Sequence, residues 1–469
     1  MSQDFRLTVY QPYDGAEIEA LDCAQWPEVD AMLDRATSAF ADRAARLPAY
    51  GRIEILRRLA DLLRAQREGF ASLIAREGGK PLGDARIEAD RAVNGVELAA
   101  EQIGHLHGRE IPMDLSAAGG ARLAFTRMEP IGPVVAVSAF NHPLNLIVHQ
   151  VVPAVATGCP VIVKPANTTP LTCIKFVALL HEAGLAEDMC QVAVCDIPTA
   201  ERLVTDSRVA FFTFIGSAKV GWYLRGKLAP GTRSALEHGG AAPVIICDDA
   251  DLELAVPSLV KGGYYHAGQV CVSVQRIFVD QRIKPAFMDA LANQVGQLVT
   301  GDPTKPETDV GPLITPGEVD RVEAWVDEAV SGGAQVLAGG KKIDDRLFAP
   351  TILVDPPASA NVSTLEIFGP VTCIYGFDDV ADALARANGL PVAFQSAVYT
   401  KDIDRALDLS NRLDASAVMI NDHTAFRVDW MPFAGRRTSG YGIGGIPHTM
   451  EDLMQEKMTV IQMPSNRLG

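Results

Sequence analysis

The sequence of 469 residues is poor in basic residues and contains no long hydrophobic run. Its 42 Lys and Arg residues face 58 Asp and Glu residues, a formal charge of −16, and this excess of acid argues against a nucleic-acid partner, which requires clustered cations. Apolar stretches such as 131–137 and 151–156 contain Pro or Gly and fall well short of the roughly 20 residues that span a bilayer. We therefore expect neither nucleic-acid binding nor membrane insertion.

The eight cysteines lack the spacings of a disulfide framework or a metal site. No two form a Cys-x-x-Cys pair, and none has a zinc-ligand spacing with His, so we expect reduced thiols and no metal. The first residues, Met1 to Phe5, show neither the basic nor the apolar segment of a secretory signal. Together these observations favour a cytoplasmic protein.

Strand patterns alternate with helix patterns along most of the chain, which is long enough for two or three domains. Apolar residues at helical spacing predict a helix between Tyr50 and Gly79 and another over 84–105. The alternation that follows predicts an α/β fold whose mostly parallel sheets are covered on both faces. We expect strands at 134–137, 161–163, 192–194, 209–214 and 244–246, and helices at 143–157, 171–182, 281–299, 316–331 and 401–413.

Cys271 and Glu237 carry the strongest chemical signal. Cys271 ends the polar, glycine-led segment Gly-Gln-Val-Cys, and Glu237 precedes two glycines in Leu-Glu-His-Gly-Gly. A cysteine in such a turn is a candidate nucleophile, and a carboxylate beside glycines is a candidate base that activates water. The pair predicts acyl chemistry through a thioester, although a lone buried cysteine more often behaves as a small hydrophobe.

Polar residues follow three of the predicted strands, at the strand ends where open α/β sheets bind ligands. Gly216-Ser217 leads into a helix whose free N–H groups, with Ser217 as a cap, suit a pyrophosphate, and a plain strand–helix turn fits equally well. Lys164 either donates to ribose hydroxyls or is a solvated charge. Asn141, which follows Phe140, either caps a helix or donates its amide to a developing oxyanion.

In this order the motifs resemble the aldehyde dehydrogenase superfamily over roughly residues 30 to 463, essentially the whole chain. Each motif alone is weak, whereas seven in series with compatible spacing are specific. The series comprises Asn141, Lys164-Pro165, Gly216-Ser217, Glu237-x-Gly-Gly, Gly268-Gln269-x-Cys271, Glu366-Ile367-Phe368-Gly369-Pro370 and Pro432-Phe433.

The resemblance implies a role for each motif. Cys271 attacks an aldehyde as thiolate, the amide of Asn141 and the backbone N–H of Cys271 hold the oxyanion, and Glu237 activates the water that hydrolyses the thioester. The cofactor is NAD or NADP, with NAD slightly favoured. The residues implied to contact it are Lys164, Asn167, Gly216, Ser217, Glu366, Phe368 and Phe140.

Several positions depart from the family pattern. Asn167 stands where many NAD-preferring relatives have a glutamate that repels a 2′-phosphate, so NADP stays open. His238 replaces the usual leucine after the catalytic glutamate, and Ala434 replaces a glycine. Ile443-Gly444 stands where an Arg-Glu pair is common, which we expect to alter packing or assembly near the C-terminus.

The substrate funnel of the family is implied to include His142, Asn145, His149, Arg427 and Val270, with Val272 nearby. Four of these are polar, which favours a short polar or anionic aldehyde, and Arg91 is a further candidate. The surrounding motifs resemble the branch with lactaldehyde- and phosphonoacetaldehyde-type dehydrogenases, although Val270 lacks the basic side chain expected of phosphonate specialists. The alternative for Arg427 is an ion pair with Asp429 or a nearby surface carboxylate.

The resemblance also implies an organisation in three parts. A Rossmann-like dinucleotide-binding domain is expected at 1–110 and 131–239, a catalytic α/β domain at 240–436, and a small β oligomerisation element at 111–130 and 453–469, in a homodimer or homotetramer. The two segments of the β element could pair with each other or with a second subunit. Two other functions stay open. One is a CoA-acylating dehydrogenase, against which Glu237 argues, and the other is a non-catalytic structural or binding descendant, against which intact Cys271 and Asn141 argue.

Overall fold

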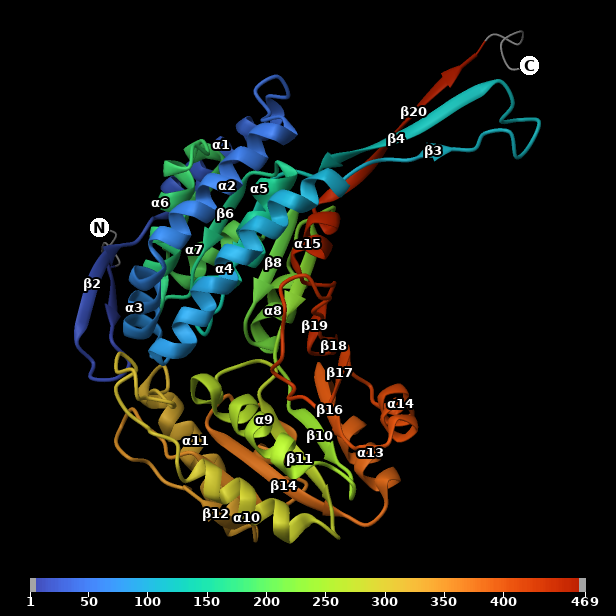
Figure 1. Ribbon diagram of the computed structural model, residues 1–469. Coiled ribbons are helices and arrows are strands. Elements are labelled where there is room, and N and C mark those ends of the chain that lie inside the picture. The colour runs from blue at the N-terminus through green and yellow to red at the C-terminus, as the bar shows by residue number, and fades with distance from the viewer. Residues whose placement is uncertain (1–5, 464–469) are drawn as a thin grey trace.

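The computed structural model describes residues 6–463, which form two α/β units and a protruding three-stranded sheet (Figure 1). The first unit contains a six-stranded sheet in the order β19-β9-β8-β5-β6-β7. Its strands are parallel except at the edge, where β19 runs antiparallel to β9. Their bounds are β5 Val134–Val137, β6 Val161–Lys164, β7 Cys190–Val192, β8 Phe211–Ile215, β9 Arg233–Glu237 and β19 Gly440–Tyr441.

Helices cover both faces of this sheet because successive strand residues point to opposite sides and are apolar on both. In β5, Val134 and Ala136 pack with helices α2 to α6 and α15, whereas Val135 packs with α1, α7 and α8. The helices are α1 Trp26–Ala41, α2 Ala49–Ala65, α3 Arg67–Gly78, α4 Leu82–Gln102, α5 Asn145–Thr157, α6 Pro170–Glu182, α7 Ile197–Val204, α8 Ala218–Arg225 and α15 Ile446–Asp452.

The second unit contains a seven-stranded sheet in the order β12-β13-β14-β11-β10-β16-β17, parallel apart from β12. One continuous apolar core holds it to its helices. The strands are β10 Ala242–Ile246, β11 Val274–Asp280, β12 Gln335–Ala338, β13 Thr351–Val354, β14 Val371–Phe377, β16 Gln395–Tyr399 and β17 Ala417–Ile420. The helices are α9 Leu252–Tyr264, α10 Lys284–Val295, α11 Pro316–Ser331, α12 Asn361–Thr364, α13 Val380–Asn388 and α14 Ile403–Arg412.

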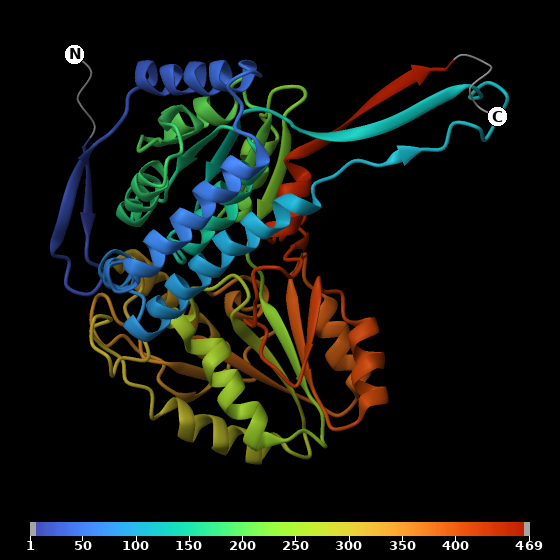
Figure 2. The ribbon, with the colours of Figure 1, turned by 45° about the horizontal axis from the view of Figure 1, so that its top comes forward.

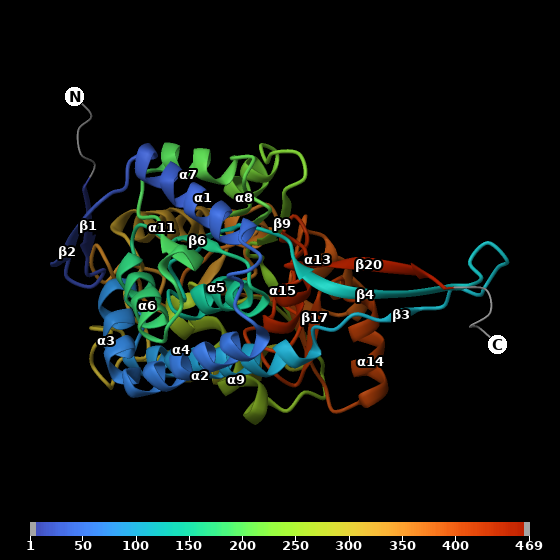
Figure 3. The same cartoon turned by 90° about the horizontal axis from the view of Figure 1, so that it is seen from above.

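The third sheet, in the order β20-β4-β3, extends away from both units (Figures 2 and 3). Its strands are β3 Glu110–Ile111, β4 Arg122–Pro130 and β20 Met454–Gln462. The sequence left open whether these two segments pair with each other, and here β4 and β20 form one antiparallel ladder within the chain. The end of the predicted 453–469 segment, residues 464–469, lies outside the described residues, as does the start of the predicted 1–110 segment.

Most predicted elements are confirmed, with differences at their ends. The helix expected between Tyr50 and Gly79 divides at Gln66 into α2 and α3, and the strand expected at 192–194 is wrong by two residues, since β7 is Cys190–Val192. Residues 437–452, which no predicted domain included, return to the first unit as β19 and α15. Within residues 6–463, no helix is both long and apolar enough to cross a membrane.

Minor elements complete the fold. A hairpin of β1 Arg6–Tyr10 and β2 Glu17–Asp22 precedes α1. A short pair, β15 Val392–Ala393 and β18 Arg436–Arg437, lies near the return to the first unit.

The two large sheets present opposite ends to one another. The strands β5, β8 and β9 end where residues 138–141, Gly216-Ser217 and Glu237 begin the facing loops. In the second unit, the facing loops come before β11 and β14 and so lie at the amino ends of those strands. The carboxyl ends of one parallel sheet and the amino ends of the other therefore supply one common site.

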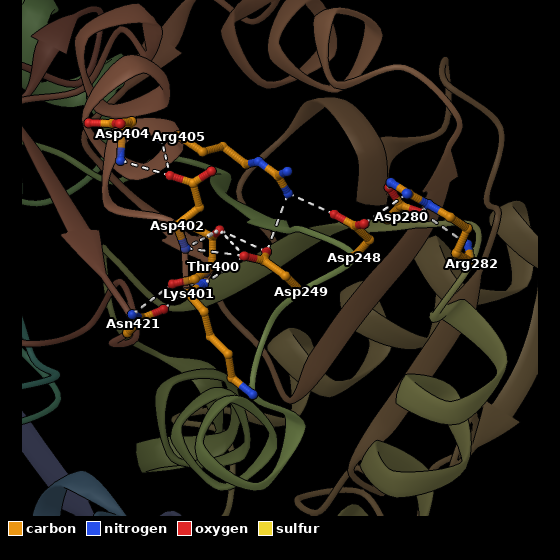
Figure 4. A network of polar contacts seen from close by, with 10 residues as sticks. All are labelled: Asp248, Asp249, Asp280, Arg282, Thr400, Lys401, Asp402, Asp404, Arg405 and Asn421. Carbon is orange, nitrogen blue, oxygen red and sulfur yellow. Dashed lines mark hydrogen bonds and ion pairs between the residues drawn. The ribbon is translucent and has the colours of Figure 1, made fainter.

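A polar network lies at the carboxyl ends of the second sheet (Figure 4). The carboxylate of Asp249, after β10, accepts hydrogen bonds from Thr400, after β16, and from the backbone N–H of Lys401. Arg405 pairs with both Asp248 and Asp249. These contacts join neighbouring strand ends, so they hold the sheet at the end opposite to the common site.

Candidate active site

A cavity of about 490 Å³ lies where the loops of the two units meet. Asn141, after β5, and Glu237, the last residue of β9, line it from the first unit. Cys271, before β11, and Arg427, after β17, line it from the second unit. The structure thus brings together the three residues that the sequence singled out for catalysis, although they are far apart along the chain.

The loop before Cys271 has an uncommon backbone conformation. His266 and Ala267 have φ angles of 49° and 54°, and Gly268 has a φ of 70°. A side chain at Gly268 would overlap the carbonyl oxygen of Gly369, so only glycine lets the loops before β11 and β14 approach this closely. Such strain persists only where the surroundings fix it, which is common at functional sites.

Asn141 is held directly beside this loop. Its side-chain nitrogen donates to the carbonyl oxygen of Gln269 at 2.8 Å, two residues before Cys271. The sequence left open a helix cap for Asn141, and this alternative is wrong, because α5 begins four residues later and the N–H groups at its start bond to Glu88. The amide is therefore fixed near the thiol and available for rearrangement toward an oxyanion.

Carboxyl groups surround the thiol of Cys271. Burial raises the pKa of Cys271 well above its usual value, the carboxyl of Glu237 raises it further, and the Arg427 guanidinium lowers it. Within residues 6–463 every other cysteine is buried, whereas Cys271 is partly accessible. The thiol is protonated at neutral pH in these surroundings, so forming the nucleophile requires a base.

Glu237 provides a carboxyl group that can serve as that base. Burial raises the pKa of Glu237, and Arg427 lowers it across 3.7 Å between Nη1 and Oε1. This oxygen has no hydrogen-bond partner among the described residues. A buried carboxyl group whose pKa is raised holds and releases protons nearer neutral pH than an exposed one.

Arg427 is nearly buried and contacts Phe433, His149 and Glu237. Its guanidinium stacks on the ring of Phe433 at 3.5 Å from the centroid, and its Nη2 lies 3.4 Å from Nδ1 of His149. The predicted alternative, an ion pair between Arg427 and Asp429, is wrong. Asp429 pairs instead with Arg91 at 2.6 Å, and the carboxylate nearest to Arg427 is Glu237.

The predicted substrate residues divide into two groups. His142, Asn145, Val270 and Arg427 line the cavity that holds Cys271. His149 lines a separate cavity of about 30 Å³ on the other side of Glu237. Its Nε2 bonds to Asp429 at 2.7 Å, and this bond holds the imidazole outside the larger cavity. His149 therefore contacts Arg427 rather than the space beside Cys271. Burial lowers the pKa of His149 to about 4.

Glu366, Phe368 and Phe140 form another part of the cavity wall. Burial raises the pKa of Glu366 to about 8, and its Oε1 has no hydrogen-bond partner among residues 6–463. A side chain on Gly239 would overlap this carboxyl group. Phe368 meets Phe140 edge to face at 5.8 Å between centroids. An unpartnered acceptor beside two aromatic rings fits the ribose hydroxyls and the flat ring of a dinucleotide.

The remaining predicted cofactor residues lie at the first sheet. Gly216 and Ser217 line the cavity. Ser217 is the N-cap residue of α8, as predicted, but its hydroxyl makes no capping hydrogen bond. Lys164 and Asn167 lie next to the lining residue Ala166. The ammonium of Lys164 donates to the side-chain oxygen of Asn167, a neutral partner.

Sequence reasoning missed several residues that line the cavity. Tyr265 lies beside His142, with 3.0 Å between its hydroxyl and Nε2 of the imidazole. Arg321 and Trp325, from α11, also face the cavity, and Arg321 lowers the pKa of Glu366. Tyr265 is close to Cys271 in the sequence and could have been considered, whereas nothing local to α11 marks its two residues.

Comparison with known proteins agrees with the family resemblance of the sequence motifs. The family model described as "Aldehyde dehydrogenase family" matches residues 1–459. The chain belongs to the aldehyde dehydrogenase family. Among its curated relatives is a 3-sulfolactaldehyde dehydrogenase from Priestia aryabhattai, 36% identical over 88% of this chain and 87% of the relative. Another is a lactaldehyde dehydrogenase from Methanocaldococcus jannaschii, 34% identical over 97% of each.

Solved structures of this family superimpose over nearly the whole chain. Aldehyde dehydrogenase 21 from Physcomitrella patens, in complex with the reaction product succinate, has a TM-score of 0.95 and 32% identity, covering 100% of this chain and 97% of that one. A glyceraldehyde-3-phosphate dehydrogenase from Methanocaldococcus jannaschii complexed with NADP has a TM-score of 0.93 and 33% identity, covering 98% and 100%. The predicted α/β fold and the prediction of an NAD(P)-dependent aldehyde dehydrogenase are confirmed.

Proposed function

We propose that this aldehyde dehydrogenase oxidises a short anionic aldehyde to a carboxylate, with Cys271 as nucleophile, Asn141 as oxyanion donor and Glu237 as general base. The observation that carries the proposal is the presence of Arg427 in the same cavity as Cys271 and Glu237. A nearly buried guanidinium with one carboxylate at 3.7 Å has donors left for a second anion.

The acyl chemistry is divided among the three residues. Glu237 or a water beside it takes the thiol proton of Cys271 and passes it to solvent, which leaves Glu237 ionised again. The sulfur then bonds to the aldehyde carbon. Asn141 leaves the Gln269 carbonyl and, with the backbone N–H of Cys271, donates to the oxyanion of the thiohemiacetal. After oxidation to the thioester, Glu237 removes a proton from water, whose oxygen displaces the sulfur and releases the carboxylate.

Most of the residues that would hold NAD or NADP line the same cavity, and Lys164 and Asn167 flank its lining residue Ala166 in the sequence. Glu366 would bind ribose hydroxyls, Phe368 and Phe140 would flank the flat ring, and Gly216-Ser217 would approach the phosphates. Lys164 and Asn167 would bind the distant ribose. When bound, the cofactor accepts the hydride of the thiohemiacetal. A neutral Asn167 tolerates a 2′-phosphate, so we propose that both cofactors bind, with NAD slightly favoured.

Some relatives support an anionic substrate, although lactaldehyde, named for another, is uncharged. Their names include sulfolactaldehyde and glyceraldehyde-3-phosphate, both anionic, and one structure carries succinate. In this chain Asp429 neutralises Arg91 through two hydrogen bonds, which leaves Arg427 as the better anion ligand of these two cavity-lining arginines. His142 and Asn145 add polar surface.

The experiment compares two aldehydes of equal length, one ending in a carboxylate and one in a methyl group. For the wild type we expect kcat/KM to favour the carboxylated aldehyde at least tenfold, as a charge-assisted contact of about 1.5–3 kcal/mol predicts. Arg427→Leu should reduce that preference to within about threefold, and Arg427→Lys should keep part of it. Because the ratio cancels any change in Cys271 or Glu237, an unchanged ratio in Arg427→Leu contradicts the anionic substrate.

Two alternatives have separate tests. A CoA-acylating enzyme would release an acyl-CoA only when coenzyme A is present. The buried carboxyl of Glu237, whose Oε1 has no hydrogen-bond partner among the described residues, favours water instead. A non-catalytic descendant would bind cofactor yet form no reduced cofactor with any aldehyde. The retention of Cys271, Asn141 and Glu237 in one cavity supports catalysis.

We also propose a cytoplasmic homodimer or homotetramer, with domains at 1–110 and 131–239, at 240–436, and at 111–130 with 453–469. The protruding sheet supports the assembly. Its β20 is an edge strand, and Leu123 lies opposite Ile461 in the ladder with both side chains exposed by about two fifths. Exposed edges that carry apolar residues are suited to pairing with another subunit.

A further inference from the structure

His238, which stands where the family usually has leucine, is a buried residue directly after β9 and next to the start of α8. Its exposed fraction is 2%, and it lines the large cavity together with Gly216 and Ser217. His238 follows the last residue of β9, and its backbone N–H donates to the carbonyl of Ser439, the residue before β19, so its backbone is held at the edge of the sheet. The proposed roles of Cys271, Glu237 and Asn141 make no use of this imidazole.

One hydrogen bond defines the chemical state of the imidazole. Nδ1 of His238 lies 2.8 Å from the carbonyl oxygen of Gly216. A carbonyl oxygen only accepts, so Nδ1 carries the proton and donates. Nε2 has no partner among the described residues, and burial lowers the pKa of His238, so the ring is neutral with a single N–H.

Neighbouring residues pack closely around the imidazole ring of His238. The ring fits only because residue 221, on α8, is glycine: a Cβ at this position would overlap the imidazole. Phe214 and Trp222 flank the ring at 5.8 and 6.2 Å between centroids. His238 is thus enclosed under the first turn of α8 and anchored to the turn that precedes it.

The bond to Gly216 fixes the orientation of the peptide that joins Gly216 and Ser217. This peptide is trans, as are all those described, so its C=O and its N–H point in opposite directions. Holding the Gly216 carbonyl toward His238 therefore directs the Ser217 N–H away from His238. Ser217 also accepts the first bonds of α8, from Val220 and Gly221, so the same constraint aligns the free N–H groups at the start of the helix.

We propose that His238 is a positioning residue for the dinucleotide, which holds the Gly216–Ser217 turn in the orientation that binds its phosphates. This inference rests on the proposed cofactor role of Gly216-Ser217. It predicts that losing the Nδ1 donor weakens cofactor binding and leaves the chemical steps at Cys271 and Glu237 nearly unchanged.

Three variants separate the hydrogen bond from the bulk of the ring. In His238→Asn the amide nitrogen takes the position of Nδ1, and in His238→Gln it takes the position of Nε2. His238→Leu, the usual family residue, has no donor. Dissociation constants for NAD and NADP are measured by calorimetry in a Cys271→Ala background, where no turnover occurs, and kcat and the KM for cofactor are measured in the Cys271 enzyme.

We expect His238→Leu and His238→Gln to raise the cofactor Kd about tenfold, equal to about 1.4 kcal/mol, with kcat and the KM for aldehyde within about twofold of the wild type. His238→Asn should restore the wild-type Kd to within about threefold. An unchanged Kd in His238→Leu, or equal losses in the Asn and Gln variants, overturns the inference. Failure of the parent protein to bind either cofactor would instead contradict the proposed function.

Discussion

Arg427 acts on two titrating groups at once, because its charge is felt by both Glu237 and the thiol of Cys271. Its charge lowers the pKa of both, against burial, which raises both. A bound anion would partly neutralise this charge. The residue is therefore expected to influence the protonation of the nucleophile as well as the choice of substrate.

Replacing Arg427 by Gln should shift the pH dependence of the reaction. The reactive form of Cys271 is the thiolate, so kcat/KM rises with pH as the thiol loses its proton. Without the guanidinium the pKa of Cys271 rises further, and the acid limb moves to higher pH. The measurement is the pH profile of kcat/KM with an uncharged aldehyde. Arg427→Lys should retain the wild-type profile, and superimposable profiles for wild type and Arg427→Gln would refute the electrostatic role.

Asn167 should determine whether NADP is accepted. Asn167→Glu introduces a carboxylate next to Lys164, which repels a 2′-phosphate, so the Kd for NADP should rise at least tenfold while that for NAD changes by less than about threefold. Asn167→Gln is the neutral control. The measurement is direct titration of each cofactor. Equal changes for both cofactors in Asn167→Glu would argue against contact between this residue and the 2′ position.

The sequence predicted which side chains meet, but not how they pair. Cys271, Glu237 and Asn141 could be selected because each lies in a recognisable local motif. The partners of Arg427 could not, since Arg91 comes from α4 and takes Asp429, which leaves Arg427 to Glu237. A separate hydrogen bond between His149 and the same Asp429 accompanies the position of His149 outside the larger cavity. Long-range charge pairing of this kind has no local pattern.

At the level of elements, two buried glutamates anchor the helices that follow the central strands. Glu77, on α3, accepts hydrogen bonds from the N–H groups of Leu171 and Thr172 at the start of α6. Glu88, on α4, accepts from Leu144 and Asn145 at the start of α5 and pairs with the buried Lys80. A carboxylate at a helix N-terminus satisfies free donors and favours the helix dipole.

Glu77→Gln should lower stability by about 2–3 kcal/mol, because the amide retains only one acceptor oxygen and turns its NH₂ group toward a backbone donor. Glu54→Gln, an exposed change on α2, should stay within about 0.5 kcal/mol. Denaturation by urea measures both. Equal stability of the two variants would show that the buried carboxylate contributes little.

Elements were predicted well where the apolar period was regular and less well at their ends. The helix over 316–331 coincides with α11, because Thr-Pro at one end and Gly-Gly at the other mark its limits. The division of the helix between Tyr50 and Gly79 was missed, since Gln66 is a good helix former and carries no breaking signal. The pairing of β4 with β20 was one of two alternatives, since neither segment has a local partner.

For the whole molecule, the site depends on how the two large sheets are placed: the carboxyl ends of the strands of the first sheet face the amino ends of the strands of the second. The sequence indicated both α/β units, but it placed no part of 437–452, which crosses back to the first unit. That return puts β19 beside Glu237 in the sheet and therefore supports the base directly. Such a crossing depends on tertiary packing and could not be read from periodicity.

The protruding sheet should hold the subunits together. Leu123→Lys combined with Ile461→Lys places charges on facing apolar positions of β4 and β20, and we expect the assembly to separate into chains of 50.2 kDa. Light scattering after gel filtration measures the mass. Leu407→Lys, an exposed position on α14, is the control and should leave the assembly intact. An unaltered mass for the double variant would locate the interface elsewhere.

The central claim is that Cys271 carries the acyl group until Glu237 directs water to release it. The most direct measurement is mass spectrometry of Glu237→Gln after reaction with an aldehyde and cofactor. A glutamine cannot accept the proton of the attacking water, whereas a water molecule can still take the thiol proton. We therefore expect slower formation of one equivalent of reduced cofactor and an acyl group that stays on the peptide containing Cys271. The absence of that adduct, or its attachment to another residue, would contradict the account.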